Sequence, residues 1–161
     1  MDPRPRLTIG WAVALGAGLA LAVLAAVPAV VGGEVGAVVR AGFSAVCHQI
    51  PERSPHLAGG PAALCHRCSG ILGGLVLGLA LTPALAAGLR QRVARGAQAG
   101  WLVAAALPTA LDWALGATGV WANTPASRAL TGAVFGLVAG VILASNLLTA
   151  RPALTQPRLA S

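Results

Sequence analysis

The chain has 161 residues, of which 57% are hydrophobic and 9% are charged, and its formal net charge is +7. This hydrophobicity is typical of a membrane protein with several spans and excludes an ordinary soluble core. The positive charge does not indicate nucleic-acid binding, because the arginines are spread over short segments between apolar stretches. We therefore expect a single integral membrane domain over residues 1–161, with the lipid bilayer and not a nucleic acid as its partner.

Four apolar segments occupy residues 7–31, 69–89, 97–118 and 129–149. About 20 residues of helix cross the hydrocarbon core, and a helix bonds its own amides. The predicted fold class is an all-α membrane protein with four transmembrane helices. The first segment has a second interpretation as a cleaved signal peptide, because arginines precede it and small residues crowd its end. Its apolar run is longer than the usual signal core, which favours a retained span.

The arginines predict the orientation in the membrane. Seven of the eleven lie on one side of the four segments: Arg4, Arg6, Arg90, Arg92, Arg95, Arg151 and Arg158. Because short cytoplasmic loops are enriched in Arg and Lys, this side and both termini are predicted to face the cytoplasm of a multi-pass cell (inner) membrane protein. The loops over residues 32–68 and 119–128 are then extracytoplasmic.

The outer loop over residues 32–68 contains a predicted helix of its own. Apolar residues recur at helical spacing over residues 35–47, while Glu34 and Arg40 lie off that stripe. This pattern predicts an amphipathic helix on the membrane or on the helix bundle. The Pro- and Gly-rich residues 51–61 that follow predict turns leading back to the second span.

Small residues also recur at every fourth position in two of the spans. The second span carries Gly70, Gly74 and Gly78, and the fourth carries Gly132, Gly136 and Gly140. Helical spacing places each trio on one face, where a neighbouring backbone can approach closely. We predict that the second and fourth helices pack together, although glycine is abundant throughout this chain.

The outer loop concentrates the residues that can carry chemistry. Cys65 and Cys68 have the C-x-x-C spacing at which two thiolates bind one metal ion or form a redox pair. Cys47 and His48 precede them by about twenty residues, near enough for the loop to fold back. Together these four residues predict a Cys3His site for zinc.

The fourth ligand is the weakest part of this prediction. His48 is adjacent to Cys47, and neighbouring residues rarely reach one ion without strain. His66 and His56 are weaker candidates, because one lies inside the C-x-x-C turn and the other in the Pro- and Gly-rich segment. The alternative is three inert apolar thiols and three surface histidines in the same loop.

Two charged residues at the same end of the predicted spans extend the site. Asp112 lies within the third span, where a carboxylate is costly and therefore suggests function. Arg128 begins the fourth span, after Thr124 and Ser127, either of which can cap that helix. We expect Asp112 either to form an ion pair with Arg128 or to act directly on a ligand.

Arg53 and Arg67 lie beside the same cluster of residues. They either bind a ligand, such as a small anion or a lipid head group, or anchor the outer loop to lipid phosphates. Topology is expected to gather one set of residues at one end of the molecule: Cys47, His48, Cys65, Cys68, Asp112 and Arg128.

The pattern CHQ-x-PERS at residues 47–54, followed by C-x-R-C-x-G at residues 65–70, resembles a family of small bacterial and archaeal predicted membrane proteins of unknown function. Asp112, Asn123 and Arg128 extend the resemblance, which runs from about residue 43 to residue 136. Its motif residues are Cys47, His48, Gln49, Pro51, Arg53, Ser54, Cys65, Arg67, Cys68 and Gly70. His66 falls at a variable place in the pattern. The resemblance implies where a site lies and no established activity.

Three classes of function fit these residues. The first is a metal site, with zinc favoured. The second is a membrane thiol-disulfide oxidoreductase, in which Cys65 and Cys68 are a dithiol and Cys47 is the exchange partner. Quinone-coupled thiol oxidases are similar but use a second cysteine pair, and the odd cysteine count here favours a metal. The third is a non-catalytic structural or partner-binding membrane protein.

Overall fold

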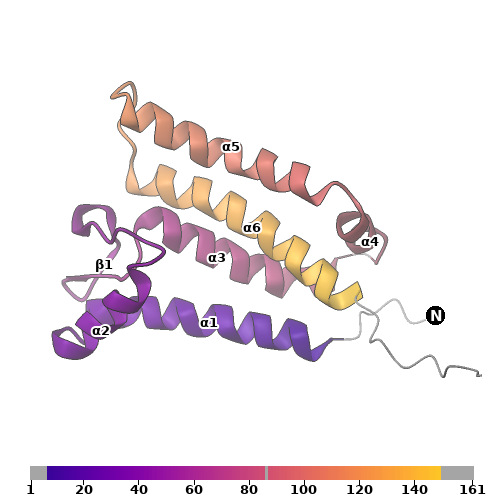
Figure 1. The fold of residues 1–161 in the computed structure, drawn as a ribbon, viewed down its shortest axis with the longest axis horizontal. Helices are drawn as coiled ribbons and strands as arrows, with labels where there is room; N and C mark the ends of the chain where they lie inside the picture. The colour runs from indigo at the N-terminus through magenta and orange to yellow at the C-terminus, as the bar shows by residue number, and fades with distance from the viewer. Residues whose placement is uncertain (1–6, 86, 150–161) are drawn as a thin grey trace, which may run out of the picture.

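The computed structural model describes residues 7–85 and 87–149, which are mostly helical (Figure 1). The elements in chain order are α1 (Ile9–Val30), α2 (Gly33–Phe43), the 3₁₀ helix η1 (Pro51–Arg53), β1 (His56–Leu57), β2 (Gly60–Pro61), α3 (His66–Leu81), the 3₁₀ helix η2 (Thr82–Ala84), α4 (Ala87–Arg95), α5 (Gln98–Ala117) and α6 (Pro125–Thr149). Within the described residues, α1, α3 with η2, α5 and α6 are long and apolar enough to cross a membrane. The predicted all-α membrane fold with four spans is confirmed.

The four long helices lie side by side, with α3 and α6 at the centre (Figure 1). α1 packs on α3 from one side, and α5 packs on α6 from the other. Many large apolar side chains of α1 and α5 are exposed, including Leu19, Val23, Trp101 and Leu107. These exposed faces consist largely of apolar side chains and are therefore suited to contact with lipid tails.

The contact between α3 and α6 confirms the prediction from the glycine trios. All six glycines face the backbone of the opposite helix, where an added Cβ would overlap a main-chain atom: Gly70, Gly74 and Gly78 face α6, and Gly132, Gly136 and Gly140 face α3. The two backbones therefore approach more closely than any side chain larger than hydrogen permits. Such small-residue contacts are how membrane helices associate without a hydrophobic driving force between them.

The second span ends earlier than the sequence pattern predicts, because α3 ends at Leu81 and η2 at Ala84, short of residue 89. Pro83 lacks the amide hydrogen that would continue the helix, so the chain turns through η2. The link to α5 then forms the helix α4, which the sequence analysis did not predict. The buried side chain of Arg90 donates to the carbonyls of Pro83 and Leu85, which holds α4 against the end of the second span.

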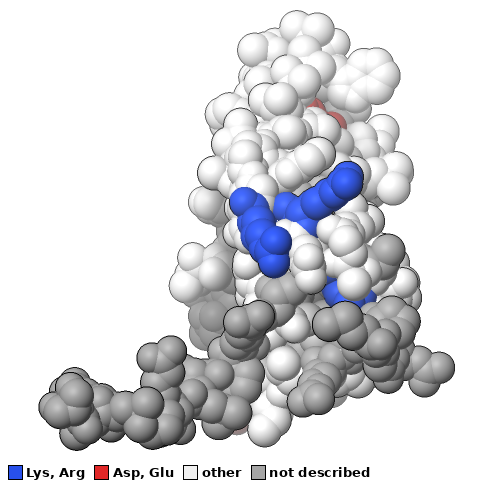
Figure 2. All heavy atoms as spheres, turned by 90° about the vertical axis from the view of Figure 1, so that its right-hand side faces the viewer, with Lys and Arg blue, Asp and Glu red and all other residues white. Residues whose placement is uncertain are grey.

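The end of the molecule that carries α4 is basic. Arg92 and Arg95 are exposed there, and Figure 2, which faces this end, shows basic side chains in blue. α1 begins and α6 ends at the same end (Figure 1). The other four arginines of the predicted cytoplasmic side, Arg4, Arg6, Arg151 and Arg158, lie outside the described residues.

The predicted outer loop lies at the opposite end and contains α2, η1, β1 and β2 (Figure 1). The amphipathic helix predicted over residues 35–47 is present as α2, but it begins at Gly33 and ends at Phe43. Gly32 and Gly33 both have positive φ, at 63° and 57°, which sets the sharp turn from α1 into α2. Gln49 donates to the carbonyl of Arg40 at 2.6 Å, so the chain reverses directly after the helix.

Two sets of hydrogen bonds hold the part of the loop that leads to Cys65. The guanidinium of Arg40 donates to the carbonyls of Pro61 and Ala62. The amide of Ala63 donates to the carbonyl of Ala25 in α1 at 2.8 Å. These bonds place residues 61–65 against α1 and α2, and therefore bring Cys65 to the segment that contains Cys47.

Candidate functional site

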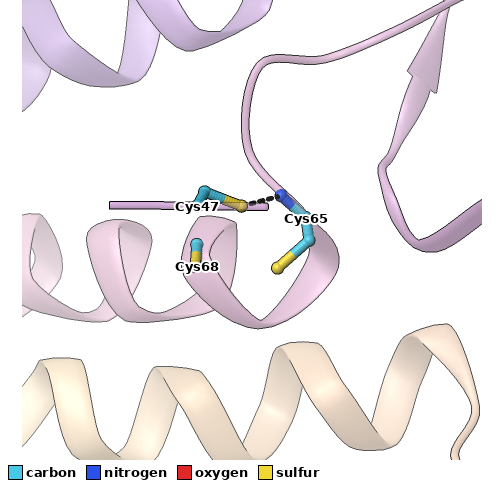
Figure 3. A group of neighbouring side chains, drawn as sticks. All are labelled: Cys47, Cys65 and Cys68. Carbon is cyan, nitrogen blue, oxygen red and sulfur yellow. Dashed lines mark hydrogen bonds between the residues drawn. The ribbon is translucent and has the colours of Figure 1, made fainter. Parts of the chain in front are cut away.

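The three cysteines meet at the outer end of α3 (Figure 3). The sulfur atoms of Cys47, Cys65 and Cys68 all lie within 4.8 Å of one another. All three are free thiols. The prediction that the loop folds back over the C-x-x-C pair is confirmed, and this cluster could hold a metal ion.

Local structure explains why the three sulfurs converge. Cys65 precedes the first residue of α3 and Cys68 lies in its first turn, so both side chains emerge at the helix start. Cys47 is 5% exposed and packs with Ala25 and Leu64 in the apolar core of the loop. The amide of Cys65 donates to the sulfur of Cys47 at 3.2 Å, which joins the two parts of the cluster (Figure 3).

The environment of Cys65 favours its thiolate. A hydrogen bond from the thiol of Cys68 is the largest cause that lowers the pKa of Cys65, to about 4 from an ordinary value of 9.0. The amides of Cys68 and Arg67 and the side chain of Cys47 lower this pKa further, whereas burial opposes the change. A thiolate is the form of cysteine that binds metals and attacks disulfides.

The histidines lie outside the group of three sulfurs. His48 is exposed, and it lines the same pocket as the cysteines. His56 is exposed in β1, and His66 is the first residue of α3. The nitrogen ligand of the predicted Cys3His site therefore stays a prediction, with His48 the histidine that shares the pocket.

The predicted ion pair between Asp112 and Arg128 is wrong. Asp112, buried in α5, instead pairs with Arg67 in the first turn of α3. Arg67 and Asp112 come from adjacent outer ends of their helices, so the ionic contact ties α3 to α5 across the start of α6. The Nε–H group of Arg67 is buried without a hydrogen-bond partner in the described part of the chain.

Asn123 connects the loop between α5 and α6 to the same place. Its amide nitrogen donates to the backbone carbonyl of Asp112, and its side chain lies against Gly116, where a Cβ would not fit. The predicted cap of α6 is also confirmed. Thr124 and Ser127 form a reciprocal pair, in which each hydroxyl accepts from the other residue's amide at 3.0 and 3.1 Å.

A pocket of about 390 Å³ opens beside the thiol cluster. Its lining combines sulfur, imidazole, amide, guanidinium and apolar groups: Val46, Cys47, His48, Gln49, Ile50, Arg53, Cys65, Arg67, Cys68, Ile71, Trp113 and Arg128. A second, smaller hollow of about 190 Å³ lies beside it and is lined by Arg53, Arg67, Trp113, Gly116, Ala117, Asn123 and Arg128. The structure thus brings the three predicted arginines together next to the cysteines.

Trp113 is one of the lining residues that sequence reasoning missed. It is 62% exposed and borders both hollows. From the sequence alone, an aromatic residue on a membrane helix is interpreted as a lipid-facing or interfacial side chain, which is why Trp113 was not assigned to the site. Its position in the sequence next to Asp112 is the signal that would have placed it at this end.

Comparison with known proteins agrees with the fold. An uncharacterized protein of Methanocaldococcus jannaschii is 42% identical to the chain over 41 residues, which are 26% of this chain and 26% of that protein. The match thus spans about a quarter of the length of this relative. No solved structure matches the chain. Residues 47–142, more than half of the chain, match the family model described as predicted membrane protein (DUF2085), so the chain belongs to that family.

Proposed function

We propose that Cys47, Cys65 and Cys68 bind one zinc ion as thiolates. The observation that carries this proposal is the convergence of three sulfurs within 4.8 Å of one another. Three thiolates on a tetrahedral zinc ion, with zinc–sulfur bonds of about 2.3 Å, lie about 3.8 Å apart. Only a small closure of the cluster is needed, and thiolate ligands also favour zinc or Cu(I) over harder ions.

The surroundings supply what a thiolate site requires. The Cys65 amide donates to the Cys47 sulfur, which stabilises negative charge on that ligand. The side chain of Cys47 is buried against apolar residues, so part of the site is shielded from water. The fourth position faces the pocket, where His48 or an external molecule completes the coordination.

The proposed orientation places this site outside the cytoplasm. The exposed Arg92 and Arg95 lie at the opposite end of the molecule (Figures 1 and 2), and the positive-inside rule assigns that end to the cytoplasm. A fluorescent protein fused after residue 161 should then fluoresce, whereas alkaline phosphatase fused there should be inactive. The reverse result would place the cysteines in the cytoplasm.

Metal analysis of the full-length protein tests the site. One zinc ion per chain is expected after purification without chelators, and Cys47→Ser should lose it. His48→Ala should weaken zinc retention if this imidazole is the fourth ligand, while His56→Ala, in the neighbouring hairpin, serves as the matched control. A fully folded wild type that takes up no zinc would contradict the proposal.

A thiol-disulfide oxidoreductase is the second function with a specific observation in its favour. Cys65 has a depressed pKa and lies beside a second thiol at a helix start, as in reactive dithiols. A count of free thiols separates the two functions. Three thiols released by a chelator support the metal site, whereas one disulfide and one free thiol in a metal-free protein support the redox function.

A further inference from the structure

The smaller hollow beside the thiol cluster has an unusual balance of charge. Three guanidinium groups line it, from Arg53, Arg67 and Arg128, and no acidic residue does. Asp112 pairs with Arg67 but does not line the hollow. Within residues 7–85 and 87–149, the side chains of Arg53 and Arg128 have neither an ion pair nor a hydrogen bond, so two positive charges remain uncompensated.

The helix directions add to this positive potential. Arg67 lies in the first turn of α3 and Arg128 in the first turn of α6, so both helices begin at the hollow. The amino end of a helix carries a partial positive charge, which favours anions within the first turn. The hollow therefore combines three guanidinium groups with the positive ends of two helix dipoles, which outnumber the single negative end of α5 at Ala117.

The remaining lining residues shape the hollow and supply a further polar group. Asn123 is held by its bond to the Asp112 carbonyl, and Gly116 allows the two helix ends to close around it. The indole of Trp113 forms an apolar wall. The hollow has a volume of about 190 Å³, and one water molecule takes up about 30 Å³. A tetrahedral oxyanion therefore fits in the hollow with water beside it.

We infer that this hollow binds a phosphate group through Arg53, Arg67 and Arg128. Guanidinium groups match the oxygens of phosphate with paired, charge-assisted hydrogen bonds. The hollow lies where α5 ends and α3 and α6 begin, which is the depth of lipid head groups for helices of this length.

The phosphate group comes either from a lipid head group or from a soluble phosphate. This inference does not depend on the zinc site, because the hollow is lined by arginines and Asn123 and not by the cysteines. Cys47→Ser should abolish zinc retention and leave phosphate binding in place. Failure of one proposal can therefore be told from failure of the other.

The test uses the full chain in an uncharged detergent and has two arms. In the first, equilibrium dialysis measures binding of radiolabelled inorganic phosphate. In the second, native mass spectrometry counts molecules of phosphatidic acid retained from mixed micelles with phosphatidylcholine. Binding in the first arm indicates a soluble phosphate, and binding in the second alone indicates a lipid head group; either result supports the inference.

Charge-matched variants make the test specific. Arg53→Gln with Arg128→Gln should weaken binding at least about tenfold, because each removes charge-assisted hydrogen bonds. Arg92→Gln with Arg95→Gln removes the same charge from exposed positions at the other end and should leave binding unchanged. If the first pair impairs folding, Arg53→Gln alone, on the exposed η1, should still weaken binding. Absence of binding in both arms, or equal losses in the two pairs, would overturn the inference.

Discussion

The contact between α3 and α6 and the outer end of the same two helices are stabilised in different ways. Along their length the helices meet backbone to backbone, through glycines that recur at a fixed spacing. At the outer end they are joined to α5 and the loop by side chains of residues far apart in sequence, above all Arg67 and Asp112. A periodic contact tolerates no added volume, whereas the outer end depends on particular charges and hydrogen bonds.

The largest expected effect comes from adding side-chain volume at the contact between α3 and α6. Gly74→Leu should prevent folding, because any Cβ at this position overlaps the backbone of α6, and a backbone cannot give way as a side chain can. Gly73→Leu is the matched control, since a Cβ added at this preceding residue of α3 meets open space. Helicity and monodispersity after extraction in detergent are the measurements. Equal behaviour of the two variants would contradict close packing of α3 on α6.

The ion pair at the outer end should be the next most costly feature to remove. Arg67→Gln leaves the buried carboxylate of Asp112 without its countercharge and should lower the free energy of unfolding by about 3 kcal/mol. The double variant Arg67→Leu with Asp112→Leu should recover much of this loss, because no buried charge remains. Unfolding by SDS titration in mixed micelles, followed by circular dichroism, measures both. A double variant no more stable than Arg67→Gln would show that the loss has another cause.

The interaction between the thiols of Cys65 and Cys68 should be visible in the pH dependence of the alkylation of Cys65. With a pKa of about 4, Cys65 in metal-free protein is a thiolate above that pH and should lose reactivity toward iodoacetamide only as the pH falls through about 4. In Cys68→Ala the strongest stabilising hydrogen bond is absent, so the midpoint should rise by more than about one unit, equivalent to about 1.4 kcal/mol. Mass spectrometry of the peptide that contains Cys65 gives the midpoint.

Guanidinium-unfolded protein is the control for that experiment, since Cys65 should titrate there as an ordinary thiol. An unchanged midpoint in Cys68→Ala would mean that the two thiols do not interact in the folded protein.

The smallest expected effect concerns the start of α6. Thr124→Ala removes the hydroxyl that accepts from the Ser127 amide and should cost about 1 kcal/mol of stability. Thr118→Ala is the control, because the exposed Thr118 hydroxyl bonds to carbonyls in the last turn of α5 and has no role in the start of α6. The same SDS titration compares the two. A larger loss in the control would indicate that the end of α5, and not the cap of α6, limits stability here.

The sequence by itself determined the features that depend on local geometry or on a regular spacing of residues. Apolar length predicted the four spanning helices, the glycine period predicted the α3–α6 contact, and the C-x-x-C spacing with Cys47 predicted the thiol cluster. The spans, the glycine contact and the Cys65–Cys68 pair follow from the geometry of one helix or one short turn, or from the approach that small residues allow. The meeting of Cys47 with that pair depends in addition on the tertiary bonds of Arg40 and Ala63. The cap of α6 at Thr124 belongs to the same class.

Only the tertiary structure decided which charged groups meet. Asp112 is close in sequence to the start of α6, which suggested Arg128, but α3 lies near enough for Arg67 to reach the carboxylate instead. The end of the second span and the helix α4 likewise depend on Pro83 and on the buried bonds of Arg90. Long charged side chains select partners by the relative placement and rotation of helices, which arises from packing across the whole molecule and not from any local spacing.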